Sequence, residues 1–202
     1  MKVSGTLGLI LAGGAGRRMG GRDKAWLRWK RRPLICHAFE RLAPQVDAVV
    51  VSTNRHHWAY RRLGIEVVAD RPAWRGQGPL AAIATVLTTV SPQRLAVVPV
   101  DAPCAPTDHV ARLAMALGAG APAAAVYDGL RRQPLFALLS GHLVDAAAAG
   151  VEHASPPPMH EWLDGLGATW IDLSSQQTAF VNINSPADLL RLQNTVDSCV
   201  PD

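Results

Sequence analysis

A glycine-rich loop directly follows the first apolar run of the chain, Leu7–Leu11. Glycines stand at positions 13, 14, 16, 20 and 21, and Arg17, Arg18 and Lys24 lie among or beside them. Glycine lets backbone N–H groups approach an anion closely, and the cations add positive charge. In open α/β sheets, ligands bind at the carboxyl ends of strands. The segment therefore predicts a phosphate-binding loop, with Arg18 and Lys24 neutralising the phosphates. The alternative is a solvated basic surface.

Two familiar phosphate loops do not fit this segment. A dinucleotide fingerprint beginning at Gly14 would need a third glycine where Met19 stands. A Walker A loop ending at Gly21 would continue with Lys and Ser or Thr, but Arg22 and Asp23 follow. The loop therefore indicates a nucleotide site of another kind.

Asp101 is the candidate metal ligand. It ends Leu95–Val100, the most apolar strand candidate, so we expect its carboxylate at the ligand-binding edge of the sheet. A hard oxygen ligand at that place suits Mg²⁺ bridging phosphates. The alternative is an aspartate that only forms the next turn. The position favours the metal role.

Asp70 and Asn54 are candidates for reading a base. Guanine presents two adjacent N–H donors on its Watson–Crick edge, and one carboxylate accepts both. Cytosine and adenine lack that donor pair, so Asp70 would select guanine. Asn54 would bond to the base or ribose, unless it only caps the next helix. The alternative for Asp70 is a turn after the third strand.

Strand and helix patterns alternate along the chain, which favours a three-layer α/β/α sandwich with a Rossmann-like, mostly parallel sheet in one domain, residues 1–202. Its N-terminal part would bind the nucleotide, and roughly residues 120–190 the acceptor. The expected strands are Leu7–Leu11, Ala48–Ser52, Glu66–Val68, Leu95–Val100, Ala123–Tyr127, Leu135–Leu139 and Thr169–Leu173. The expected helices are Pro33–Leu42, His56–Leu63, Leu80–Thr89, Thr107–Leu117, Gly141–Ala149, His160–Leu166 and Pro186–Asn194. Thr107 and Ser185 are the expected N-caps of their helices.

Composition excludes several classes of protein. Hydrophobic residues make up 49% of the 202 residues, which predicts a packed globule, and no apolar run is long enough to span a bilayer. The N-terminus is typical of a buried strand rather than a signal peptide, so we expect a cytoplasmic protein. The three widely spaced cysteines predict free thiols.

Residues 17–32 hold eight basic residues and one acidic residue, a net charge of +7. No nucleic-acid motif accompanies them, and we expect a basic helix surface over Arg28–Arg32.

The motifs together resemble the molybdenum cofactor guanylyltransferase (MobA) family of nucleotidyltransferases. The family's opening pattern of LAGG, three residues, RMGG, one residue and DK is matched by residues 11–24. Further matches follow in order along nearly the whole chain: Asn54-Arg55-His56, Asp70, Gly78-Pro79-Leu80, Asp101-Ala102-Pro103, Arg132-Gln133-Pro134 and Phe180–Pro186. Ala82 stands where the family usually has glycine.

The resemblance implies a nucleotide-diphospho-sugar transferase type of fold and transfer of GMP from GTP to the phosphate of molybdopterin. It implies Mg²⁺ on Asp101 and catalytic roles for Arg18, Lys24 and Asp101. Transient contacts with cofactor-biosynthesis proteins or apo-molybdoenzymes would follow from the same resemblance. The nucleotide contacts it implies are Leu11, Ala12, Gly13, Gly14, Lys24, Asn54, Asp70 and Asp101. We hypothesise that the acceptor phosphate attacks the α-phosphorus in line and needs no general base, because it is already largely dianionic at neutral pH.

The acceptor side is the weaker part of the resemblance. No Lys or Arg occurs between Arg132 and Arg191, where the family has a basic residue. Acceptor binding would therefore depend on Arg131, Arg132 or the basic loop, and Arg132 is the candidate in the matched motif. Asn182 and Asn184 would lie near the metal or the acceptor, although they could instead form a turn. Related enzymes with another substrate remain alternatives, namely a cytidylyltransferase of the same cofactor or an adenosylcobinamide-phosphate guanylyltransferase. Gly14 ends an LAGG motif at residues 11–14, which favours the guanylyl enzyme, because cytidylyl relatives commonly have LAAG there.

Overall fold

A computed structural model of the protein describes residues 5–13 and 23–194 and contains one seven-stranded sheet. The strand order is β5-β4-β1-β6-β8-β7-β9. The strands are β1 (Thr6–Leu11), β4 (Ala48–Ser52), β5 (Glu66–Val68), β6 (Arg94–Pro99), β7 (Ala123–Tyr127), β8 (Arg132–Ser140) and β9 (Thr169–Asp172). Each contains or overlaps one expected strand, so the apolar runs of the sequence located all seven.

The sheet is mostly parallel, as expected, and β8 is the exception. The pairs β1–β4, β1–β6, β4–β5 and β7–β9 are parallel, whereas β8 runs antiparallel to both β6 and β7. Only four residues separate β7 from β8, which is too short for a crossover. The Asp128 carboxylate forms this turn by accepting the N–H groups of Leu130 and Arg131, both at 2.8 Å.

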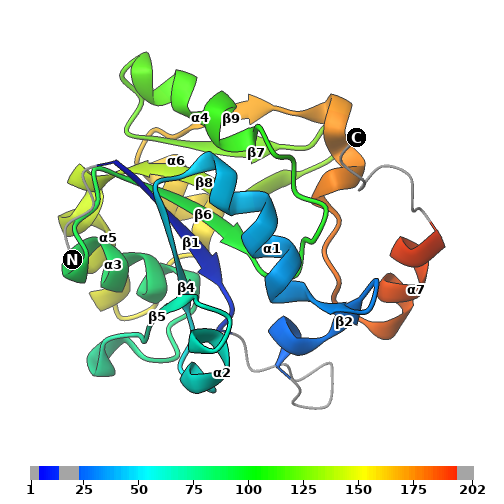
Figure 1. Ribbon diagram of the computed structural model, residues 1–202. Helices are drawn as coiled ribbons and strands as arrows, with labels where there is room; N and C mark the ends of the chain where they lie inside the picture. The colour runs from blue at the N-terminus through cyan, green and yellow to red at the C-terminus, as the bar shows by residue number, and fades with distance from the viewer. Residues whose placement is uncertain (1–4, 14–22, 195–202) are drawn as a thin grey trace.

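Helices cover both faces of the sheet, which confirms the three-layer α/β/α sandwich (Figure 1). One apolar cluster joins α3, α5 and α6 to the sheet, and a second joins α1, α2 and α4 to the opposite face. The α-helices are α1 (Leu34–Leu42), α2 (His57–Arg61), α3 (Pro79–Thr89), α4 (His109–Gly118), α5 (Val144–Glu152), α6 (Met159–Gly165) and α7 (Pro186–Asn194). The 3-10 helices are η2 (Lys24–Trp26), η3 (Ala43–Gln45), η4 (Pro72–Trp74), η5 (Gly141–Leu143) and η6 (Ser174–Phe180).

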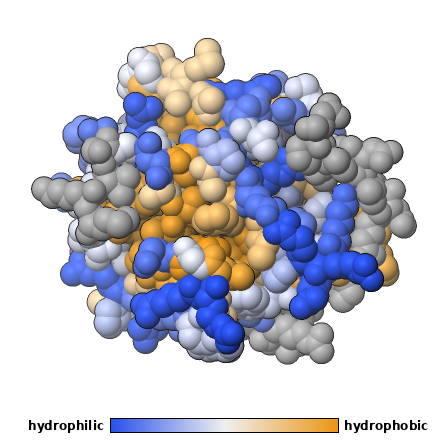
Figure 2. All heavy atoms as spheres, viewed as in Figure 1, coloured by the Kyte–Doolittle hydropathy of each residue, from blue (hydrophilic) through white to orange (hydrophobic). Residues whose placement is uncertain are grey.

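Successive residues of the central strands point to opposite helix layers. On β6, Leu95 and Val97 pack in the cluster with α3, whereas Ala96 and Val98 pack in the cluster with α1 and α4. On β1, Gly8 lets α1 approach closely, because a Cβ there would lie 2.8 Å from a methyl carbon of Leu42. Both faces of the sheet are thus buried, and ligands reach it only at its edges or at the strand ends. On the surface face drawn in Figure 2, hydrophobic residues gather in the middle and hydrophilic residues surround them.

Two expectations about local secondary structure were wrong. Arg28–Arg32 is a two-stranded ribbon, β2 (Arg28–Trp29) and β3 (Arg32–Pro33), and not a helix surface. The buried ring of Trp29 anchors it in a third apolar cluster with Ile183 and Leu192. Helix α4 starts after Asp108 rather than Thr107, because Thr107 and Asp108 belong to the preceding turn.

The expectation of free thiols holds for Cys36 and fails for Cys104, which is disulfide-bonded. Spacing along the chain does not show which cysteines the fold brings within bonding distance. Among the described residues, no helix is both long and apolar enough to cross a membrane.

His109, at the start of α4, should make stability depend on pH. Its ring is 1% exposed, and its Nδ1 lies 2.6 Å from the carbonyl oxygen of Pro106, while Nε2 has no hydrogen-bond partner in the described part of the chain. Burial lowers the pKa of His109 below the ordinary 6.5, although the Pro106 carbonyl opposes this shift. In the unfolded chain, His109 binds a proton as the pH falls through about 6.5, whereas in the native protein it stays neutral. The free energy of unfolding therefore decreases as the pH falls below that value.

Between pH 7 and pH 5.5, we expect the free energy of unfolding of His109→Asn to decrease by about 1 kcal/mol less than that of the wild type. The asparagine amide can still donate to Pro106 but does not titrate. Urea unfolding of both proteins at the two pH values measures the difference, in which the other titrating groups cancel. An identical pH dependence in the two proteins would contradict the assignment.

Candidate active site

A cleft of about 840 Å³ opens at the carboxyl ends of β1, β4 and β6. These strands are parallel neighbours, so the residues that follow them meet at one edge of the sheet. Leu11, Ala12 and Gly13 follow from β1 into the cleft wall, and the Ala12 N–H donates to the Ser52 carbonyl at 3.0 Å. A pocket of this volume is typical of a small-molecule site.

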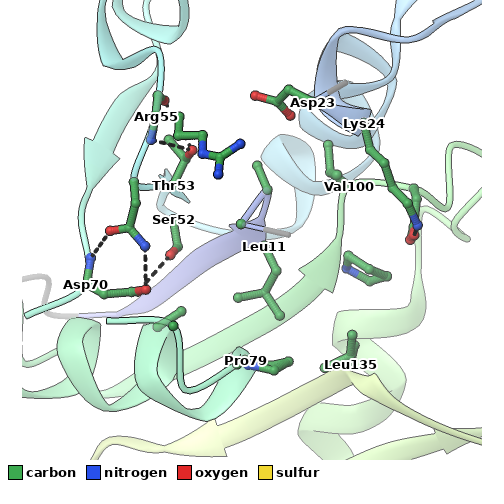
Figure 3. Close-up of a pocket in the computed structure, with 18 of the residues that line it drawn as sticks. Leu11, Asp23, Lys24, Ser52, Thr53, Arg55, Asp70, Pro79, Val100 and Leu135 are labelled. Atoms are coloured by element: carbon green, nitrogen blue, oxygen red, sulfur yellow. Dashed lines mark hydrogen bonds and ion pairs between the residues drawn. The ribbon is translucent and has the colours of Figure 1, made fainter. Parts of the chain in front are cut away.

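Asp70 and Asn54 form a reciprocal pair on one side of the cleft (Figure 3). The Asn54 Nδ2 donates to Asp70 Oδ2 at 2.7 Å, and the Asp70 backbone N–H donates to Asn54 Oδ1 at 3.1 Å. The Ser52 hydroxyl lies 3.5 Å from the other carboxylate oxygen. These contacts orient the carboxylate and leave it further lone pairs for ligand donors.

Lys24 and Asp101 face each other on the other side of the cleft. The Lys24 Nζ lies 2.9 Å from Asp101 Oδ2 and 2.6 Å from Asn184 Oδ1. The Lys24 and Asp101 side chains are 26% and 16% exposed, so both remain open to a ligand. Figure 3 shows Leu11 between Lys24 and Asp70. The cleft therefore places an acceptor of hydrogen bonds on one side and an ammonium–carboxylate pair on the other.

Asp23 holds Lys24 in place through the short helix η2. Its carboxylate accepts the Ala25 N–H at 3.0 Å as an N-cap, and the Tyr60 hydroxyl donates to it at 3.4 Å. Burial, reinforced by the charge of Asp23, raises the pKa of Tyr60, which therefore stays protonated and a donor. Since Ala25 is also buried, the backbone of Lys24 is fixed and only its side chain is free to turn.

The C-terminal segment reaches the cleft by pairing with the loop after β6. The Ile183 N–H donates to the Asp101 carbonyl at 2.8 Å, and the Ile183 side chain is fully buried. This contact brings Asn182 and Asn184 to the cleft wall on either side of Ile183. The Oδ1 of Asn182 is buried, and no described residue forms a hydrogen bond with it. An unpaired buried oxygen is costly unless a ligand donates to it or binds it.

Ser185 confirms the N-cap expected for α7. Its hydroxyl accepts the Asp188 N–H at 3.2 Å, and the Asp188 carboxylate accepts the Asn184 N–H at 2.9 Å. This reciprocal cap orients Asn184 toward Lys24.

Arg132 is not brought into the cleft. It begins β8 at the same edge of the sheet, but its guanidinium pairs with Asp164 at 2.6 Å and lies over the Trp170 ring, 4.7 Å from the centroid. The Trp170 Nε1 donates to the same carboxylate at 2.9 Å, and these donors lower the pKa of Asp164. Two other predicted site residues, Gly14 and Arg18, lie outside the described residues.

Comparison with known proteins decides the family. The model of the MobA-like NTP transferase domain matches residues 8–166, which contain the cleft except for the asparagine segment. The chain belongs to this family. The match extends beyond the opening loop to β8 and α6, so it covers the elements that form both sides of the cleft.

Relatives that are named molybdenum cofactor guanylyltransferase match almost the entire chain. A molybdenum cofactor guanylyltransferase of Shewanella halifaxensis is 36% identical over 189 residues, covering 93% of this chain and 94% of the relative. One of Mannheimia succiniciproducens is 37% identical over 185 residues, covering 90% and 95%. The crystal structure of molybdopterin-guanine dinucleotide biosynthesis protein A from Archaeoglobus fulgidus has a TM-score of 0.77 and 22% identity, covering 94% of this chain and 97% of that one. This structure supports the MobA-like fold.

Sequence reasoning missed two cations of this MobA-like cleft as site residues. Arg55 and Arg75 line it and are exposed, and neither has an ion-pair partner within the described part of the chain. Arg55 directly follows Asn54, so its position was visible in the motif. Arg75 lies in the loop between β5 and α3, where only the path of the chain brings it back to the cleft. The arrangement can therefore bind a polyanion with an attached base.

Proposed function

We propose that this protein transfers GMP from GTP to the phosphate of molybdopterin and releases pyrophosphate. One observation supports this proposal most directly: the cleft has a different residue pair on each side. Asp70 and Asn54 lie on one side, and Lys24 and Asp101 lie on the other. The first pair suits the two N–H donors of guanine. The second pair, with the glycine-rich loop that precedes it, suits phosphates. Relatives named molybdenum cofactor guanylyltransferase support the choice of guanine and of the acceptor.

The residues beside Asp101 fit Mg²⁺, which we propose as the cofactor. Asp101 supplies a carboxylate, and the amide oxygens of Asn182 and Asn184 lie on the same wall. No group of three or more His, Cys, Asp or Glu side chains occurs in the described residues. This pattern suits Mg²⁺, which typically takes one or two carboxylates and completes its shell with phosphates and water. When bound, the metal would supply positive charge to the α- and β-phosphates.

The residues of the chain act in this reaction by position and charge. The acceptor phosphate oxygen attacks the α-phosphorus, the bond from that phosphorus to the β-phosphate oxygen breaks, and pyrophosphate leaves in line. The acceptor is largely dianionic at neutral pH, so no side chain has to take a proton from it. Lys24 neutralises the phosphates as charge shifts to the leaving group. Arg18 would add a second cation.

The acceptor site is proposed on the wall formed by Asn182 and Asn184. Their position beside Asp101 supports a contact with an acceptor that must approach the α-phosphate. Arg132 would contact a more distant part of the acceptor, since it lies at the same sheet edge but pairs with Asp164. Contacts with cofactor-biosynthesis proteins or apo-molybdoenzymes and a cytoplasmic location remain predictions of the sequence.

Calorimetry with the four nucleoside triphosphates tests this function. In the presence of Mg²⁺, we expect GTP to bind at least tenfold more tightly than CTP, ATP or UTP. With molybdopterin added, mass spectrometry should detect the guanine dinucleotide and a colorimetric assay should detect pyrophosphate. Preference for CTP would instead indicate the cytidylyl enzyme. GTP binding with transfer only to adenosylcobinamide phosphate would indicate the cobinamide enzyme.

A further inference from the structure

The Lys24 ammonium contacts the same oxygens that would bind the metal. It donates to Asp101 Oδ2 at 2.9 Å and to Asn184 Oδ1 at 2.6 Å, which accounts for two of its three N–H donors. Asp101 is 16% exposed, so a ligand can reach its carboxylate, but Lys24 already contacts one of the two oxygens. Lys24 and a divalent cation would therefore bind to the same carboxylate, that of Asp101.

We infer that Lys24 and Mg²⁺ compete for Asp101, so that the metal binds together with the triphosphate and not before it. This inference rests on the proposed triphosphate site. An ammonium within hydrogen-bonding distance of a partly buried carboxylate repels a dication placed on the same group. The phosphates of the incoming nucleotide offer Lys24 replacement acceptors. Once Lys24 turns to them, Asp101 is released to the metal that arrives with the nucleotide.

The backbone around Lys24 permits this exchange without a larger rearrangement. Asp23 caps η2 and Ala25 is fully buried, so the main chain stays fixed while the four-carbon side chain turns. Leu11, Ala12 and Gly13 line the same cleft, so phosphates bound along them would lie on the same side as Lys24. The interaction with Asp101 is therefore a resting contact of Lys24, and the phosphates are its second set of partners.

The consequence is an order of binding. Without nucleotide, Lys24 occupies the Asp101 carboxylate, and the protein binds the metal weakly. With triphosphate present, Lys24 contacts the phosphates, and the Asp101 carboxylate is free to bind the metal. Lys24 then acts twice, since it excludes unproductive metal binding and afterwards neutralises phosphate charge.

Binding of Mn²⁺, followed by electron paramagnetic resonance of the free ion, tests the competition. Without nucleotide, we expect Lys24→Met to bind Mn²⁺ about tenfold more tightly than the wild type, the size of effect expected from one charge-assisted hydrogen bond. Lys24→Gln should shift the affinity in the same direction, which guards against a folding defect in one variant. The matched control is Lys30→Met, which removes the same charge from the β2–β3 turn, where the Lys30 ammonium lies over the Trp29 ring.

Four outcomes of these measurements test this inference separately from the proposed function. Equal Mn²⁺ affinity of the wild type and both Lys24 variants without nucleotide would overturn the competition. An equal gain in Lys30→Met would also overturn it, because the effect would then be one of overall charge. The gain should disappear when Asp101→Asn is added to Lys24→Met. If GTP fails to bind the wild type under any metal condition, the proposed function fails, whatever Lys24 does to Mn²⁺.

Discussion

Replacing Asp101 by Asn should slow guanylyl transfer roughly 10³-fold and leave the protein folded. Asparagine keeps the size of the side chain and one carbonyl oxygen, so the turn after β6 is retained. It loses the negative charge that would hold the metal and that attracts Lys24 at 2.9 Å. Several kcal/mol of transition-state stabilisation depend on a metal at the reacting phosphates, and each 1.36 kcal/mol corresponds to a factor of ten in rate.

The measurement is the single-turnover rate of pyrophosphate release with saturating GTP, Mg²⁺ and molybdopterin. Asp108→Asn is the matched control, because Asp108 lies in the same region between β6 and α4. Its carboxylate pairs with Arg112 at the surface. We expect this control to remain within threefold of the wild type. Thermal unfolding of both variants checks that the fold is kept. An Asp101→Asn rate within tenfold of the wild type would remove Asp101 from the catalytic machinery.

Replacing Asp70 by Ala should weaken GTP binding about 10²-fold and leave the affinities for CTP and ATP within threefold. Two charge-assisted hydrogen bonds to guanine, each contributing roughly 1.5 kcal/mol, correspond to this factor. Asp70→Asn should also lose affinity, because its amide nitrogen would face a donor of the base. That variant keeps the size of the side chain and therefore tests the chemistry of the carboxylate rather than the packing around Asn54.

Calorimetry on the wild type, the two Asp70 variants and Glu66→Gln measures the specificity. Glu66 is exposed at the start of β5, and its replacement removes the same charge from the same strand–loop unit. A loss shared equally by all triphosphates would assign Asp70 to the general shape of the cleft and not to the base. An unchanged GTP affinity in Asp70→Ala would contradict base reading outright.

The local elements of the site could be predicted from the sequence. Short apolar runs located all seven strands of the sheet, because strands buried on both faces are nearly continuous in apolar residues. The glycine-rich loop and Asp101 were predicted to lie at the ligand-binding edge of the sheet, because ligands bind at the carboxyl ends of strands. Gly13 and Asp101 do line one cleft, and Asn54, a candidate for binding the base or ribose, lines it as well. These conclusions needed only the pattern of neighbouring residues.

The tertiary structure decided which side chains are partners. Lys24 and Asn184 are 160 residues apart, and their contact depends on the buried packing of Ile183 and Trp29 between the β2–β3 ribbon and the last segment. The same holds for Arg132, which the motif placed near the acceptor but which the fold pairs with Asp164. The antiparallel direction of β8 likewise follows from a turn held by Asp128.

What the sequence by itself determined about this protein is therefore the order of its elements, its family resemblance and the chemical types at the strand ends. What only the tertiary structure decided is the pairing of Lys24 with Asp101, the orientation of Asp70 by Asn54 and the separation of Arg132 from the cleft. The physical reason is one of range. Periodicity and turn chemistry act over a few residues, whereas these pairings arise when packing of the whole core brings distant segments to within 3 Å.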